Sequence, residues 1–272
     1  MIKRIFKVLA VIAVIALVIT VVAAAFVLNA LLGNPVSKAL TTKNAEEHLA
    51  KNYGGDFIIN EVSYSFKDGK YYAYVTSPSS IDSSFTIFAD GFGRPQGDSY
   101  EERVLSGRNT ADRIYEDYRK ITDPILQAED FPYEMSIYFG ELIFTERLYK
   151  DDPDTPSYAL ITEELTRDGE YDANLLGAIC GEVTIYIFSE DLSYENLAEK
   201  VLTVKGIFDE AGVNFHSINL VLEHPDTDGR VEVRRLLYDD IYEDGMAERA
   251  KASNEAAMAY YENANEHKKN EI

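Results

Sequence analysis

The segment from Val8 to Leu32 constrains this chain more than any other, because only Thr20 and Asn29 within it are polar. An α-helix rises about 1.5 Å per residue, so about 20 apolar residues suffice to cross the hydrocarbon core of a bilayer. The segment therefore predicts one transmembrane helix over residues 8–32.

The residues before this helix carry only positive charge, from Lys3, Arg4 and Lys7. The positive-inside rule then predicts that residues 1–7 form a cytoplasmic stub and that the rest of the chain lies outside the cell membrane. A cleaved signal peptide is the alternative, because Ala23-Ala24-Ala25 could form a small-residue cleavage site. Secretory apolar regions usually span about 7 to 15 residues, so the longer run here favours an uncleaved anchor.

The chain has 26 basic and 47 acidic residues, a net charge of −21. Such a field repels nucleic acid, which we therefore exclude as a partner. A solvated exterior is the ordinary explanation of this charge, and weak binding of divalent cations or of a basic partner are the alternatives. The single cysteine, Cys180, cannot form an internal disulfide, and we expect it to be a small buried apolar residue.

Residues 36–128 predict a first domain made of a helix, a three-strand meander and a second helix. Ala45, Leu49 and Tyr53 recur on one face of the first helix, which we expect to begin near Thr41. The first strand alternates apolar and polar residues, the second is rich in tyrosine, and Asp68-Gly69 predicts a tight hairpin between them. The second helix is expected to be capped near Asn109 and to stop before Pro124.

The stretch ADGFGRPQGD, residues 89–98, allows three interpretations: a phosphate loop, a calcium loop or a turn. A phosphate-binding loop leads directly into a helix, whereas Gly91, Gly93 and Gly97 have another spacing and no helix follows at once. A calcium loop needs alternating oxygen ligands and a closing glutamate, which are absent. We therefore expect a turn. The similar HPDTDGR, residues 224–230, separates two predicted strands and indicates a hairpin.

Residues 129–272 predict a second α+β domain that ends in a C-terminal helix. GEVTIYIF is a strand, and the helix that follows begins at Ser193 and ends at Gly212. Two further strands, FHSINLVLE and RVEVRRLLY, give the order β-α-β-β. The expected fold class is thus α+β, with a transmembrane helix followed by two small domains of antiparallel sheet with packed helices.

The chain shows no signature of nucleophilic or metal-dependent catalysis. His48 and His267 are expected to be ordinary surface residues, and His216 and His224 lie about 26 Å apart along one strand at about 3.3 Å per residue. The motifs H-E-x-x-H, C-x-x-C and G-x-S-x-G are absent. We therefore name no catalytic residue, no metal ligand and no cofactor.

Pairs of carboxylates are harder to exclude, because a glycosidase needs only two acids at about 5 to 9.5 Å. Three adjacent acidic pairs stand out, but neighbours in a strand point to opposite faces, so we expect them to be solvated. These pairs are Asp151-Asp152, Glu163-Glu164 and Asp239-Asp240.

A group of polar residues around the end of the meander is the candidate for a partner or ligand surface. Its members are Asp82, Asp98, Arg103, Arg108, Asn109 and Arg113. Arginine's planar fork suits carboxylate or phosphate partners. The alternative is that these arginines pair with the domain's own acidic residues and fix the loop that follows the third strand.

Three stretches resemble the YfjL-like family, a group of uncharacterised single-pass membrane proteins of Gram-positive bacteria. They are GNPVSK at 33–38, SYSFKDGKYYAYVTSPSSIDSSFTI at 63–87 and GDSYEERVLSGRNTADR at 97–113. The segment 191–212 resembles a helix of the family's C-terminal part. The resemblance implies an exported domain on a one-helix anchor, and it implies no activity, catalytic residue or cofactor.

The function that we expect is a membrane-anchored extracytoplasmic binding module for an envelope protein or peptide. The alternatives are a cell-envelope hydrolase that uses a carboxylate pair and a passive structural or accessory subunit.

Overall fold

The computed structural model describes residues 2–270, with the side chains of residues 11–24, 27–29 and 31–259. The chain forms two compact units, Met1–Asn109 and Thr110–Ile272. We call them the first and the second unit. The helix that starts at Arg108 lies mainly in the second unit, and the domain boundary after residue 128 stays a prediction.

Helix α1, Ile2–Leu32, contains the predicted apolar segment. Its span Val11–Asn29 is long and apolar enough to cross a membrane, and none of that span is buried against the rest of the chain. The side chains of Lys3, Arg4 and Lys7 lie outside the described residues. The helix ends directly before Gly33, which adopts a positive φ of 76°.

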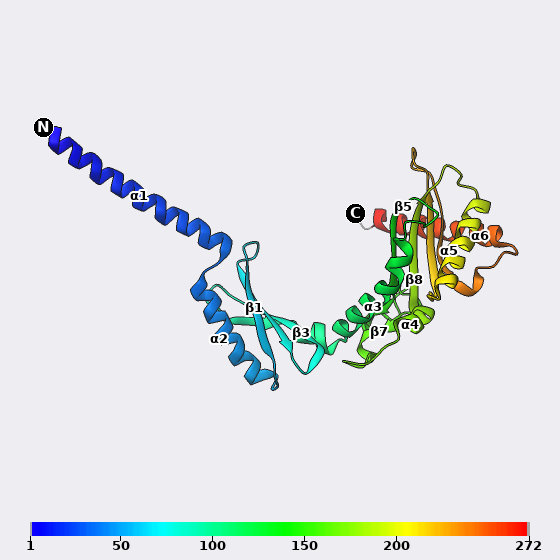
Figure 1. Cartoon of the computed structure of the whole chain (residues 1–272), viewed down its shortest axis with the longest axis horizontal. Coiled ribbons are helices and arrows are strands. Elements are labelled where there is room, and N and C mark those ends of the chain that lie inside the picture. The colour runs from blue at the N-terminus through cyan, green and yellow to red at the C-terminus, as the bar shows by residue number, and fades with distance from the viewer. Residues whose placement is uncertain (1, 271–272) are drawn as a thin grey trace. The chain divides into compact units, whose positions relative to one another are not determined.

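Besides α1, the first unit contains helix α2 and a four-stranded antiparallel sheet in the order β1-β2-β3-β4 (Figure 1). The bounds are α2 Pro35–Asn52, β1 Ile58–Ser65, β2 Lys70–Ser77, β3 Ser80–Ala89, β4 Pro95–Asp98 and the π-helical turn η1 Glu101–Leu105. The meander is confirmed, and β4 adds a fourth strand that the sequence missed. Helix α2 begins earlier than expected, because Pro35 occupies its first turn and the side chain of Asn34 accepts a hydrogen bond from Val36 N.

The core of the first unit lies between α2 and the sheet. Ala45 and Leu49 of α2 are buried against inward-facing strand residues, as their spacing predicted. The strand residues in this core are Ala73, Val75, Phe85 and Ile87. Partly buried aromatic rings close one end of the core, and Tyr53 and Tyr100 are two of them.

Residues 90–94 form the turn predicted for the stretch 89–98 and pack on α2, whereas residues 95–98 form β4. Ser37 Oγ donates to the Gly91 carbonyl at 2.7 Å, and Asn44 Nδ2 donates to the Gly93 carbonyl at 2.8 Å. Gly93 has a φ of 75°, and a Cβ there would lie 2.6 Å from Thr41 N. Only glycine fits such a backbone beside a helix, so the glycine serves packing.

The second unit contains four helices, three short η turns and two sheets among the described residues. The bounds of its helices are α3 Arg108–Leu126, α4 Ala173–Cys180, α5 Tyr194–Ala211 and α6 Met246–Asn270. The bounds of its strands are β5 Met135–Leu142, β6 Phe144–Thr145, β7 Leu160–Ile161, β8 Gly181–Phe188, β9 Ser217–Glu223 and β10 Arg230–Leu237. The η turns are η2 Arg147–Tyr149 after β6, η3 Thr162–Glu164 after β7 and η4 Tyr238–Asp240 after β10.

The main sheet of the second unit has the order β10-β9-β8-β5 and is mixed. β8 and β9 run parallel because α5 connects them as a crossover, whereas β5 with β8 and β9 with β10 are antiparallel. The α+β class is therefore confirmed, and the expectation of a purely antiparallel second sheet is corrected. The hairpin predicted at 224–230 joins β9 to β10. Pro124 lies inside the last turn of α3, two residues before its end, so α3 runs further than expected.

Helix α6 covers the outer edge of β10. Asn254 Oδ1 accepts a hydrogen bond from Glu232 N at 2.9 Å, and Ser253 Oγ accepts one from Arg234 N at 3.1 Å. An edge strand otherwise presents free backbone groups to other chains, so these side chains satisfy and protect the edge.

We predict that Asn254→Ala loosens β10, because it leaves the buried amide of Glu232 without an acceptor. Such a loss costs about 1–3 kcal/mol. Amide hydrogen exchange of the full-length protein in detergent micelles should show about 5- to 150-fold faster exchange in β10. Glu255→Ala, at an exposed position of the same helix, is the control, and equal exchange in both variants would contradict the role of Asn254.

Candidate functional site

Three of the six predicted surface residues meet where β3, η1 and α3 come together. Asn109 Nδ2 donates to the carbonyls of Asp82 and Ser84 at 2.8 and 2.7 Å, and Arg103 Nε donates to Asn109 Oδ1 at 2.9 Å. Asp82 is only 2% exposed. Asn109, which was expected to cap α3, thus fastens the start of that helix to β3.

The other three predicted residues make further contacts. Arg108 Nη1 lies 3.8 Å from Glu102 Oε1 in an exposed pair, and Arg113 Nη2 donates to the Gly169 carbonyl at 2.9 Å in the second unit. Asp98 belongs to a separate cluster. A partner surface formed by all six residues stays a prediction.

Asp98 accepts three hydrogen bonds at the end of β4. Its Oδ2 accepts from His48 Nε2 at 2.8 Å and from Tyr53 Oη at 2.6 Å, and its Oδ1 accepts from Tyr100 N at 3.0 Å. Burial acts to raise the pKa of Asp98, but the bonds from Tyr53 and His48 outweigh it and hold this pKa below its usual range. The carboxylate is therefore the charged centre of the cluster.

His48 is half-buried in this cluster, so the expectation of an ordinary surface residue is corrected. Its Nδ1 lies 3.0 Å from Asn52 Nδ2, while its Nε2 faces Asp98. The two bonds together define the tautomer that carries its proton on Nε2. Both ring nitrogens are engaged, which leaves neither free to act as a base on a nucleophile.

A recess of about 510 Å³ lies beside this cluster. It is lined by Asn52, Tyr53, Asp98, Tyr100, Glu101 and Leu105. The Tyr53 and Tyr100 ring centroids are 4.4 Å apart, and the rings pack with Phe57 and Phe85. The recess is thus an aromatic and acidic hollow.

The second unit holds a pair of glutamates that the sequence did not indicate as a pair. Glu141 of β5 lies directly opposite Glu182 of β8 in the antiparallel register, which places their Cβ atoms about 4.5–5.5 Å apart. Burial, and then the neighbouring Glu182, raise the pKa of Glu141. The available signal was that each glutamate interrupts an apolar strand, but only the register joins them.

Glu182 is held by three donors, one from the loop before β7 and two from β9. Tyr158 Oη and Ser217 Oγ donate to its Oε2 at 2.7 and 3.1 Å, and Asn219 Nδ2 donates to its Oε1 at 2.6 Å. The Tyr158 ring packs against His216 with centroids 4.4 Å apart. Both carboxylate oxygens serve these internal donors, so the arrangement fixes the polar face of the sheet.

All three acidic pairs singled out in the sequence are exposed, as expected. Glu163 accepts from Arg147 N, and Glu164 Oε1 lies 3.1 Å from Arg147 Nη2. Within the described residues, no three His, Cys, Asp or Glu side chains gather in a way that could hold a metal ion. Cys180 is fully buried, and burial raises the pKa of its thiol to about 12, so it stays protonated.

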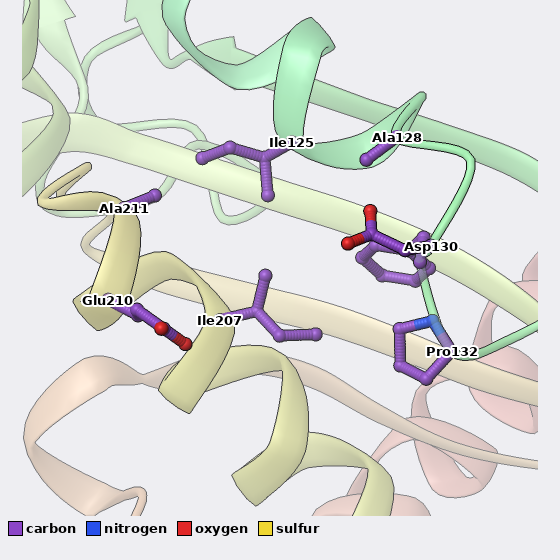
Figure 2. A pocket seen from close by; sticks show the side chains of 8 residues that line it. Ile125, Ala128, Asp130, Pro132, Ile207, Glu210 and Ala211 are labelled. Atoms are coloured by element: carbon purple, nitrogen blue, oxygen red, sulfur yellow. The ribbon is translucent and has the colours of Figure 1, made fainter.

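An apolar groove of about 360 Å³ lies between the end of α3, the following loop and the end of α5. Its lining residues are Ile125, Ala128, Asp130, Phe131, Pro132, Ile207, Glu210 and Ala211. Figure 2 shows Ile125 and Ile207 facing each other across the groove, while the carboxylate of Asp130 points into the space between them. Sequence reasoning missed this site, because its two sides are about 80 residues apart.

We predict that Asp98→Asn destabilises the first unit by about 1–3 kcal/mol, because donors at His48 and Tyr53 lose a charged acceptor. The lowered pKa stabilises the folded state above the unfolded value of about 3.9, and this contribution is lost as the pH falls through the folded pKa. Urea unfolding from pH 2 to 7 should show that acid-side loss in the natural chain and less of it in the variant. Glu46→Gln is the exposed control, and an unchanged midpoint for Asp98→Asn would contradict the role of Asp98.

We predict the opposite pH dependence for Glu141. Its raised pKa means that the folded state binds the proton more tightly, so stability falls as the pH rises from about 4.3 through the folded pKa. Glu141→Gln removes that loss and should unfold at a higher urea concentration than the natural chain at pH 7. Glu243→Gln, which is exposed, is the control, and parallel pH profiles for Glu141→Gln and the natural chain would overturn this account.

Comparison with known proteins identifies two family domains in the chain. Residues 6–99 match the YfjL-like N-terminal domain, and residues 117–251 match the YfjL-like C-terminal domain. No curated protein matches the chain. A crystal structure of a DUF5037 family protein from Ruminococcus gnavus is similar over 79% of this chain and 98% of that one, at 12% identity and a TM-score of 0.22, too low to support an argument. Because the two domains span most of the sequence, the chain belongs to the YfjL-like family, as the resemblance of its three stretches predicted.

Proposed function

We propose that this chain is a membrane-anchored binding module, whose two units lie outside the cell membrane and engage an envelope protein or peptide. The observation that carries the proposal is helix α1. Its described side chains are exposed throughout Val11–Asn29, so this apolar surface needs a lipid environment. The positive charges before it favour a cytoplasmic N-terminus.

The connection between α1 and α2 is short and packs against the sheet of the first unit. Gly33 and Asn34 alone separate α1 from α2. Asn34 N donates to Tyr71 Oη at 2.7 Å, and a Cβ on Gly33 would lie 2.7 Å from Tyr64 Cβ. An anchor joined in this way holds the first unit near the membrane surface.

The chemistry of the polar clusters favours binding over the hydrolase alternative. Both oxygens of Glu182 and both nitrogens of His48 are engaged by neighbouring side chains or backbone. Groups occupied in this way stabilise the fold and offer no free base or nucleophile. The apolar groove favours a binding role over a passive spacer, because it presents a surface with a defined chemical preference.

We predict that a protease added to intact protoplasts digests the bulk of the full-length protein, and that the mature chain keeps residues 1–32. Immunoblotting with N- and C-terminal tags, together with N-terminal sequencing, measures both outcomes. A mature chain that begins near Phe26, or a bulk that resists protease until the protoplasts are lysed, would contradict the proposal.

Val18→Arg provides a matched variant of this experiment. A charged residue at the centre of a transmembrane helix costs about 2.5–3.5 kcal/mol of insertion free energy. A larger share of this variant than of Val18→Leu should appear in the carbonate-soluble fraction.

A further inference from the structure

We propose that the groove in Figure 2 binds a lysine or arginine side chain of the partner peptide. This inference rests on the proposed binding function and adds the chemical class of the ligand. Four features of the groove support it: its acidic rim, the two helix ends that meet there, its apolar walls and its size.

The acidic rim consists of Asp130 and Glu210. Both residues are exposed, and neither carboxylate has an ion pair or hydrogen bond among the described residues. The nearest basic residue along α5, Lys205, already pairs with Asp209 at 3.2 Å. The rim therefore keeps two negative charges that a bound cation would neutralise.

Two helix C-termini meet at the groove. Ile125 lies in the last turn of α3, which ends at Leu126, and Glu210 lies in the last turn of α5, which ends at Ala211. Neither last turn contains a basic residue. A helix C-terminus carries a partial negative charge that favours cations, so Glu210 adds to an existing negative potential.

The groove walls suit the apolar stem of a long basic side chain. Ile125, Ile207, Ala128, Ala211 and Pro132 supply aliphatic surface. Lysine and arginine bury their methylene stems along such surface while the charged head stays near water. Phe131 adds an aromatic ring, whose face attracts cations.

The size of the groove points to one or two side chains and not to a large cofactor. Its volume of about 360 Å³ lies at the lower end of the range of about 300–1,000 Å³ that is usual for ligand pockets. A short basic segment of a peptide or protein is therefore the occupant that fits both charge and size.

Methyl NMR of the full-length protein in detergent micelles tests this inference. The δ1 methyl groups of Ile125 and Ile207 are reporters inside the groove. The probe is the capped tripeptide acetyl-Leu-Lys-Leu-amide, and its matched partner replaces lysine with norleucine, which keeps the stem without the charge. We expect both methyl signals to shift in a saturable way with the lysine peptide. The affinity for the norleucine peptide should be lower by about tenfold or more.

Charge-neutral variants complete the experiment. Asp130→Asn combined with Glu210→Gln should weaken binding of the lysine peptide about tenfold or more. Asp226→Asn combined with Asp228→Asn removes the same charge from the β9–β10 hairpin, which does not line the groove, and should leave the affinity unchanged.

Three results would overturn the inference: equal binding of the two peptides, an equal loss in both double variants, or no shift at Ile125 and Ile207. These results are independent of the protoplast experiment. A chain that faces outward but ignores the lysine peptide refutes the groove assignment alone, and a chain that binds the peptide but resists external protease refutes the proposed location.

Discussion

Apolar side chains on one face of the main sheet of the second unit pack against Leu197, Val201, Val204 and Phe208 of α5. Burying each such side chain stabilises the fold by about 1.5–3 kcal/mol, so this contact fixes which residues of β8 and β9 face the helix. A slip of one residue would turn Glu182 and Ser217 into the core. The opposite face must therefore hold the polar residues, and there they bond to one another.

The same core explains why a groove forms at the ends of two helices. Leu126, the last residue of α3, is part of the core that α5 covers, so α3 has to end beside α5. A helix end in this position cannot be buried completely, because its last carbonyl groups need partners. The gap between the two ends is apolar inside and negative at its rim. The packing of the two helices alone accounts for this gap.

Much of the fold could be predicted from the sequence because its signals are local. Alternation in β1, the Asp68-Gly69 turn and the Ser193 and Gly212 caps all act within a few residues, and the structure confirms these elements. The candidate sites depend on pairings across the chain. Glu141 faces Glu182 only through strand register, and His48 meets Asp98 only when β4 pairs with β3. The four-residue β4 contains Pro95 and Gly97, so it has no strand signal apart from that pairing.

The negative charge of this chain affects a basic partner at long range and at short range, and added salt weakens the long-range effect more. The net charge of −21 produces a diffuse field that speeds the approach of a basic partner but is screened beyond about 8 Å at physiological ionic strength. Within the groove, a bound cation would lie close to a carboxylate and two helix ends, at separations shorter than this screening length. Screening there is much weaker. Added salt should therefore slow association with a basic partner more than it speeds dissociation from the groove, because only the encounter depends on charges many ångströms away.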